Sequence, residues 1–157
     1  MTWTQLPQQQ ISSIAPADRG AMEAARRRWD AIAKPLRGLG RLEDLLVRMA
    51  GVTGSPDLDL GRKALAVFCA DNGVVAEGVT QTGQEVTAIV AENMSTGDTS
   101  VCAMSRAAGA EVVPVDIGTA VPVMGARIRQ KCVRRGTANM TQGPAMTRQE
   151  AERAVLT

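Results

Sequence analysis

A chain of 157 residues, of which 45% are hydrophobic and 22% charged, is long enough to form a globular domain with its own core. Its net charge of +2 is too weak to argue for nucleic-acid or membrane partners, and neither is expected; the absence of histidine removes the commonest general base and metal ligand. No apolar run approaches the roughly 20 residues needed to span a bilayer, and no signal peptide is recognisable. We therefore expect a cytoplasmic protein, with Cys69, Cys102 and Cys132 as reduced thiols because they lack zinc-type spacing.

Residues 1–60 are predicted to form an N-terminal arm and a small helical lobe. The first 16 residues are polar and glutamine-rich, as expected of a loose or docking arm. A first helix is predicted to begin after Asp18 as N-cap and to end before Lys34-Pro35, with an apolar stripe of Met22, Ala25, Trp29 and Ile32. A second helix is predicted to end at Gly51 as its C′ residue, with a stripe of Leu39, Leu42, Leu46 and Met49.

Residues 61–157 are predicted to form a partial Rossmann-like α/β domain, truncated at its C-terminus. Residues 64–70 are continuously apolar, which favours a parallel strand covered on both faces. Helices are expected over 84–94 and from Thr99 or Ser100 to Gly109, before a second strand over 111–117. This order predicts a right-handed strand–helix–strand unit. Pro114 predicts that the second strand lies at an edge or carries a bulge.

The signals weaken after Ala120. Residues 121–135 are compatible with an edge hairpin or with an extended crossing segment. Thr147 and Glu150 form a capping-box pattern that predicts a last helix. Since the sequence stops at Thr157, we expect this helix either to pack on a neighbouring chain or to fray.

An acid and an amide, Asp71 and Asn72, follow the first predicted strand. Ligands of open α/β sheets bind outside the carboxyl ends of the strands, so a binding role is one interpretation. The alternative is that these side chains staple the loop by Asx-type hydrogen bonds. Asp116 repeats the pattern after the second strand, but without a GxGxxG fingerprint it is only a weak candidate for binding ribose.

The loop before the first α/β helix carries Thr80, Thr82 and Gln84, whose side chains suit hydrogen bonds to a neutral heterocycle. The alternative for Thr82 is to cap the helix, with Glu85 at N3. Glu77 and Glu85 are the carboxylates nearest this loop, and each is either a buried base or a solvated side chain.

A basic cluster precedes the sequence Gly-Thr-Ala-Asn near the C-terminus. It offers either a phosphate contact or a solvated or intersubunit ion-pair surface, and consists of Arg127, Arg129, Lys131, Arg134 and Arg135.

Four segments in order, residues 34–45, 67–80, 84–118 and 135–151, resemble the N-terminal part of the nicotinate-nucleotide–dimethylbenzimidazole phosphoribosyltransferase family. The resemblance implies a Rossmann-like fold with a smaller helical domain, and a homodimer. It implies phosphoribosyl transfer from nicotinate mononucleotide to 5,6-dimethylbenzimidazole, giving α-ribazole phosphate for the lower ligand of cobalamin. It further implies a glutamate base and neither a metal nor another cofactor.

The departures from the family pattern limit what can be carried over. The family's glutamate base and glycine-rich phosphate loops belong to its C-terminal half, so we expect this chain to be inactive, or nearly so, by itself. Asn72 stands where the family usually has histidine, and the family turn KPPGSLGRLE is altered at Leu36, Arg37 and Gly38.

Thr82 fits the small hydroxyl residue that faces the benzimidazole in the family. The resemblance therefore implies a base pocket at Thr82, with Asn72 and Gln84 nearby. Together with Asp71 at the strand end, these residues form the expected substrate-binding set. The alternative is a non-catalytic module that binds a benzimidazole or pairs with a full-length homologue or a separate C-terminal chain. A generic nucleotide-binding domain is a further alternative, which the missing glycine fingerprint disfavours.

Overall fold

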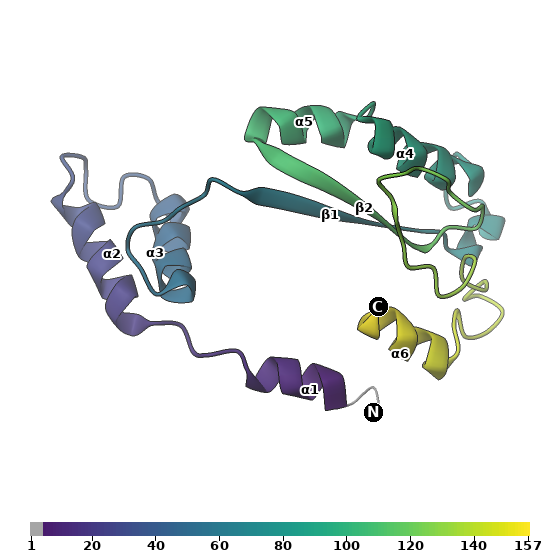
Figure 1. Ribbon diagram of the computed structural model, residues 1–157, viewed down its shortest axis with the longest axis horizontal. Helices are drawn as coiled ribbons and strands as arrows, with labels where there is room; N and C mark the ends of the chain where they lie inside the picture. The colour runs from purple at the N-terminus through teal and green to yellow at the C-terminus, as the bar shows by residue number, and fades with distance from the viewer. Residues whose placement is uncertain (1–4) are drawn as a thin grey trace. The chain divides into compact units, whose positions relative to one another are not determined.

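The computed structural model describes residues 5–157 and divides into two compact units, Pro7–Gly61 and a unit containing Arg62–Thr157 (Figure 1). The described chain opens with helix α1 (Gln5–Ser12), in a segment for which the sequence predicted only an arm. None of the helices in residues 5–157 has the length and apolar character that crossing a bilayer requires.

The helical unit is built on α2 (Arg19–Ala31) and α3 (Arg41–Thr53). The predicted N-cap is confirmed, because the Asp18 carboxylate accepts a hydrogen bond from the backbone N–H of Ala21 at 3.0 Å. Helix α2 ends ahead of Lys34-Pro35, as predicted. The two helices share a small apolar core of Ala25, Val47 and Ala50, with Met22, Trp29 and Leu58 packed against it.

The predicted apolar stripe of α3 is wrong. Leu42 is 50% exposed, and the buried face is formed by Glu43, Val47, Ala50 and Gly51. Gly51 lies inside the helix rather than after it. A Cβ there would come within 2.7 Å of the Met22 side chain, so the glycine gives α2 room to pack against this face. The helix ends instead at Gly54, which has a φ of 69°. Close approach of α2 therefore selects the face with small residues over the face with leucines.

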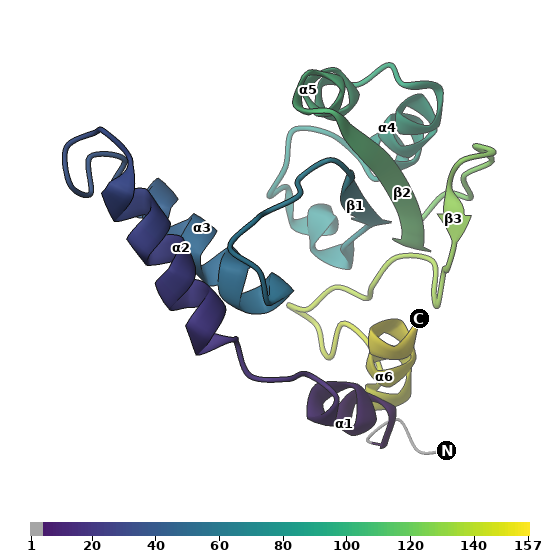
Figure 2. The same cartoon turned by 60° about the vertical axis from the view of Figure 1, so that its left-hand side comes forward.

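The α/β unit has a parallel three-stranded sheet in the order β1-β2-β3, which confirms the predicted fold class. Its strands are β1 (Lys63–Ala70), β2 (Ala110–Gly118) and β3 (Arg129–Gln130). The crossover from β1 to β2 contains the 3-10 helix η1 (Gly73–Glu77), α4 (Glu85–Thr96) and α5 (Ser100–Ala108). Helices α4 and α5 lie on the same side of the sheet (Figure 2). The segment after Ala120 returns as a parallel strand and not as a hairpin.

The last helix is α6 (Arg148–Leu156), and its predicted capping box is confirmed. The Thr147 hydroxyl accepts from the Glu150 N–H at 3.2 Å, and the Glu150 carboxylate accepts from the Thr147 N–H at 2.7 Å. These bonds lower the pKa of Glu150.

The core of the α/β unit lies between the sheet and α4 and α5. It consists of Cys69, Ala88, Ala91, Met94, Cys102, Val123 and Ile128. The expectation that β1 is covered on both faces is wrong for the described chain, because Phe68 is 68% exposed and Leu65 is 41% exposed. Strand β2 is central rather than at an edge, and the register shifts near its end, after the Cys69–Asp116 pair. Pro114 lies just before the two residues of β2 that pair with β3.

Candidate functional site

Three segments meet where β1 and β2 end, and we call them together the carboxyl edge: residues 71–73, 118–120 and 135–139. The N–H of Asp71 donates to the Gly118 carbonyl at 3.0 Å, and so does the N–H of Gly136 at 3.1 Å. The N–H of Thr137 donates to the Asp71 carbonyl at 3.0 Å. The chain after β3 therefore runs across both strand ends (Figure 2).

Glycines meet the backbone constraints of this edge, and a Cβ on Gly118 would lie 2.9 Å from the Arg134 carbonyl oxygen. The Gly73 N–H donates to the Thr137 hydroxyl at 3.0 Å, and a Cβ on Gly73 would lie 2.5 Å from the Thr137 carbonyl oxygen. Gly136 has a φ of 64°, and its Cβ position lies 3.8 Å from the Gln84 side-chain nitrogen. The Gln84 amide thus reaches the carboxyl edge from the start of α4.

Of the predicted site residues, the structure brings Asp71, Asn72 and Gln84 together. Gln84 Nε2 donates to the backbone carbonyl of Asn72 at 3.1 Å, while the Asn72 side chain is exposed. Asp71 is only 4% exposed, and its Oδ2 accepts from the Ala120 N–H at 2.7 Å. Asp71 therefore ties the end of β1 to the segment after β2 through a partner 49 residues away, and not through the local Asx-type bond of the alternative interpretation.

Thr82 lies two residues before Gln84 and is exposed. The capping alternative is wrong, because the N-cap residue of α4 is Gln84 and not Thr82, and no side chain caps the first turn of the helix by a hydrogen bond. The Thr82 backbone N–H contacts the Thr80 hydroxyl at 3.4 Å. Within the described residues the Thr82 hydroxyl makes no hydrogen bond, so both its donor and its acceptor capacity remain available to a ligand.

Asp116 is the buried centre of the carboxyl edge and is fully shielded from solvent. Its Oδ1 accepts from the N–H groups of Gly118 and Thr119 at 3.0 and 2.9 Å, and from the Thr119 hydroxyl at 3.0 Å. Its Oδ2 accepts from Arg135 Nη1 at 2.8 Å. These bonds occupy both oxygens, so Asp116 organises the edge rather than offering itself to a ribose.

Two glutamates near the site have different surroundings. Glu77 accepts from the Asn139 amide at 2.5 Å and from the Thr141 hydroxyl at 3.0 Å, and these bonds lower its pKa. A lowered pKa makes Glu77 a poorer general base. The Glu85 carboxylate lies against Gly83 in the loop before α4 and is exposed.

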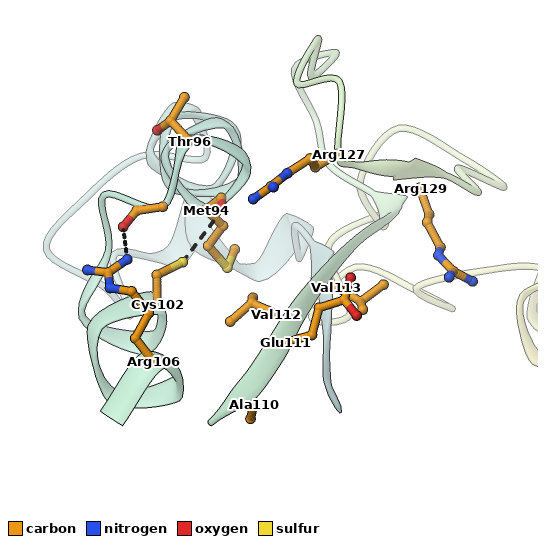
Figure 3. Close-up of a pocket in the computed structure, with 11 residues that line it drawn as sticks. Met94, Thr96, Cys102, Arg106, Ala110, Glu111, Val112, Val113, Arg127 and Arg129 are labelled. Atoms are coloured by element: carbon orange, nitrogen blue, oxygen red, sulfur yellow. Dashed lines mark hydrogen bonds between the residues drawn. The ribbon is translucent and has the colours of Figure 1, made fainter. Parts of the chain in front are cut away.

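The predicted basic cluster does not form one site. Arg135 belongs to the carboxyl edge, whereas Arg134 donates to the Glu150 carboxylate and the Ala145 carbonyl, both at 3.4 Å. Arg127 and Arg129 line a groove of about 580 Å³ beside the amino end of β2 (Figure 3). In Figure 3 Arg127 extends toward Met94, while Arg129 points away.

The groove includes none of the predicted substrate-binding residues Asp71, Asn72, Thr82 and Gln84. The sequence did not place Arg135 and Gly136 at the strand ends, although a glycine directly after a basic pair was a usable signal for a sharp change of backbone direction there.

No group of three histidine, cysteine, aspartate or glutamate side chains is arranged to hold a metal ion in the part of the chain that the structure describes. The three cysteines are free thiols, and burial, with a smaller contribution from Asp116, raises the pKa of Cys69.

Comparison with known proteins gives one consistent result. Residues 14–157 match a family model described as Phosphoribosyltransferase. The chain is 44% identical over 149 residues to the nicotinate-nucleotide–dimethylbenzimidazole phosphoribosyltransferase of Escherichia coli, covering 93% of this chain and 41% of that protein. It is 40% identical over 147 residues to the Acetivibrio thermocellus protein of the same name, covering 94% of this chain and 42% of the relative.

The fold agrees with a solved structure of similar sequence. The crystal structure of the Thermus thermophilus protein of that name superposes with a TM-score of 0.82 at 41% identity, covering 88% of this chain and 42% of the solved one. The chain thus spans about two fifths of the length of the relatives that it matches.

Proposed function

The chain belongs to the nicotinate-nucleotide–dimethylbenzimidazole phosphoribosyltransferase family, and from this premise we propose that its carboxyl edge forms one wall of the pocket for the acceptor base. The reaction proposed for the whole site is transfer of the phosphoribosyl group from nicotinate mononucleotide to 5,6-dimethylbenzimidazole, giving α-ribazole phosphate for the lower ligand of cobalamin. A cytoplasmic location is part of the same proposal and is tested by cell fractionation.

The observation that carries the proposal is the loop leading from Thr80 to Gln84. Its Thr82 hydroxyl is exposed and makes no hydrogen bond within residues 5–157, and it lies two residues from the amide that reaches the carboxyl edge. A hydroxyl that both donates and accepts suits a benzimidazole, which carries one N–H and one unprotonated ring nitrogen. Asn72, in the carboxyl edge, adds a second exposed polar residue.

We further propose that these 157 residues bind but do not catalyse. Deprotonating the benzimidazole needs a base. The buried carboxylates of Asp71 and Asp116 already accept hydrogen bonds within the carboxyl edge. The hydrogen bonds from Asn139 and Thr141 lower the pKa of Glu77. Positioning both substrates also needs surfaces on both sides of them. Glu85 is the exposed carboxylate beside the loop. If the wild type turns over in the activity assay, Glu85→Gln tests whether this side chain is the base.

Titration calorimetry with 5,6-dimethylbenzimidazole tests the binding part of the proposal. We expect saturable binding by the wild type and a loss of about tenfold in affinity in Thr82→Val, which keeps the shape and removes a hydrogen bond worth about 1 kcal/mol or slightly more. Thr141→Val is the matched control, because the Thr141 hydroxyl is already bonded to Glu77. Equal affinities in all three proteins would contradict the assignment of Thr82.

An assay for α-ribazole phosphate with the same wild-type protein tests the catalytic part. We expect no turnover above the rate without protein. Robust turnover by the 157-residue chain would contradict the proposal that catalysis needs residues outside it.

A second candidate function is association with another chain, and the exposed face of β1 favours it. Phe68 is 68% exposed on a strand that lies at the edge of the described sheet. We propose as partners a second copy, a full-length homologue, or a separate chain carrying the C-terminal half of the relatives. Light scattering and co-purification test this candidate, and a monodisperse monomer that captures none of these partners would contradict it.

A further inference from the structure

One guanidinium at the carboxyl edge is anchored at a single nitrogen. Arg135 Nη1 donates to Asp116 Oδ2 at 2.8 Å, and it also contacts the hydroxyl and carbonyl oxygens of Thr119 at 3.2 and 3.3 Å. Within the described chain, Nε and Nη2 of Arg135 make no hydrogen bond. The Arg135 side chain is 43% exposed, whereas its Asp116 partner is 0% exposed.

The anchor is rigid because Asp116 is itself fixed. Its other oxygen is held by two backbone N–H groups and one hydroxyl from residues 118–119. A guanidinium presents its N–H donors in a planar fork, so fixing one nitrogen also sets the direction of the remaining donors. The remaining two nitrogens can bind a carboxylate or a phosphate with paired, charge-assisted hydrogen bonds.

The neighbours of Arg135 place it beside the proposed pocket. The next residue, Gly136, donates its N–H to Gly118, and its Cβ position lies 3.7 Å from the Asp71 carbonyl oxygen and 3.8 Å from the Gln84 amide nitrogen. The other arginines of the basic cluster do not share this position, since Arg134 is paired with Glu150 and Arg127 lines the groove by the amino end of β2.

We propose that Arg135 binds an anionic group of the mononucleotide substrate, either its carboxylate or its phosphate, from the rim of the acceptor-base pocket. This proposal rests on the proposed function and adds a specificity residue to it. Asp116 acts through Arg135 as a positioning residue, because it holds the guanidinium in place without touching the ligand.

Calorimetry on the 157-residue chain tests the proposal with nicotinate mononucleotide as the probe. We expect Arg135→Gln to weaken nicotinate mononucleotide binding by about tenfold or more and to change 5,6-dimethylbenzimidazole binding by less than about twofold, because the benzimidazole is neutral. Arg127→Gln is the matched control and is expected to change neither affinity. Separate titrations with nicotinate, which has only the carboxylate, and with ribose 5-phosphate, which has only the phosphate, identify the group that loses affinity.

Arg135→Gln also leaves the buried Asp116 carboxylate without its counter-charge, so a double variant separates folding from binding. Arg135→Gln combined with Asp116→Asn removes both charges and keeps polar side chains at both positions. If Arg135 binds the anion, the double variant folds and its affinity for nicotinate mononucleotide stays low. Wild-type affinity in the double variant would overturn the proposal, because Arg135 would then serve only to neutralise Asp116.

Two further outcomes separate a failure of the Arg135 proposal from a failure of the proposed function. Wild-type affinity for nicotinate mononucleotide in Arg135→Gln would overturn this proposal and leave the benzimidazole pocket standing. A wild-type chain that binds neither nicotinate mononucleotide nor 5,6-dimethylbenzimidazole would overturn the proposed function and this proposal with it.

Discussion

The turn of residues 34–43 and the carboxyl edge of the sheet are both held by carboxylates shielded from solvent, but the partners of those carboxylates come from different distances in sequence. In the turn, Glu43 binds Lys34 at 2.8 Å and the N–H of Leu39 at 3.1 Å. At the carboxyl edge, Asp71 binds the N–H of Ala120, 49 residues away. The turn is therefore a local structure, whereas the edge exists only once two strands and the segment after β3 have assembled.

The two regions also differ in how they meet their backbone constraints. The carboxyl edge has glycine at its constrained positions: Gly73 and Gly118, where a Cβ would meet backbone atoms, and Gly136, which has a φ of 64°. The turn has Arg37 at a φ of 57°, the one described non-glycine residue with a positive φ. We conclude that the edge is fully adapted to its geometry and that the turn stores some strain. Four predictions test this contrast.

The largest effect is expected for Asp116→Ala. The substitution leaves the N–H groups of Gly118 and Thr119 without their acceptor in a site closed to solvent, which costs about 3 to 5 kcal/mol in total. Chemical denaturation measures the change. The exposed Asp98, which accepts from the Thr96 hydroxyl, is the control, and Asp98→Ala is expected to cost less than about 0.5 kcal/mol. Equal costs at the two positions would contradict the central role of Asp116.

Gly73→Ala is expected to cost about 2 to 3 kcal/mol, because the new Cβ meets backbone atoms of Thr137, Ala138 and Asn139 within 2.6 Å. These are backbone atoms, which cannot move aside by a side-chain rotation. Gly143 has no atom within 4 Å of its Cβ position, so Gly143→Ala is a matched control that should be nearly neutral. A neutral Gly73→Ala would show that residues 137–139 do not press against the end of β1.

Arg37→Gly is expected to stabilise the protein by about 0.5 to 1 kcal/mol. Glycine removes the cost of a positive φ, which exceeds its own entropic cost, and the family pattern KPPGSLGRLE has glycine at this position. The same substitution in the middle of α3, Arg48→Gly, should instead destabilise by about 1 kcal/mol. If both variants lose stability in a thermal melt, the turn is not strained.

The smallest effect is expected in the decrease of the free energy of unfolding at acid pH. The Lys34 ammonium, and after it the Leu39 N–H, lower the pKa of Glu43 below its ordinary 4.5. Because the pKa of Glu43 is lower in the folded state than in the unfolded chain, the ionised carboxylate stabilises the fold at a pH above its unfolded-state pKa. This stabilisation is lost as the pH falls through the folded-state pKa.

Urea titrations between about pH 3 and 7 measure this dependence. Glu43→Gln should flatten it, while Glu77 and Glu150, whose pKa values are also lowered, continue to contribute. Glu23→Gln, at a surface pair with Arg27, should leave the dependence unchanged. An unchanged dependence in Glu43→Gln would contradict the pairing with Lys34.

Local chemistry was predictable from the sequence, as the N-cap at Asp18 and the capping box at Thr147 show. The strand–helix–strand order was also predictable, because the period of apolar residues and the turn glycines mark it. The buried face of α3 was not, because the leucines and the small residues both recur at helical spacing and only the approach of α2 chooses between them.

The carboxyl edge was predictable in position but not in detail. Asp71 and Asn72 follow an apolar run, which placed them at a strand end. Their sequence neighbours do not show that Ala120 would bind Asp71, or that Arg135 would neutralise Asp116, because these partners come from the segments after β2 and β3. The capping role predicted as an alternative for Thr82 was wrong for a similar reason. Gln84 occupies the N-cap position, and its side chain donates a hydrogen bond to the backbone carbonyl of Asn72.

The most direct test of the proposed pocket is a map of amide chemical-shift changes when 5,6-dimethylbenzimidazole is added to the ¹⁵N-labelled chain. If the carboxyl edge is one wall of the acceptor-base pocket, the shifting amides cluster at Asn72, at Thr82–Gln84 and at Gly136, and Gly54 in the helical lobe stays unshifted. Shifts confined to the groove around Val112 and Arg127, or the absence of any shift at saturating ligand, would contradict the claim that the carboxyl edge is the wall of an acceptor-base pocket.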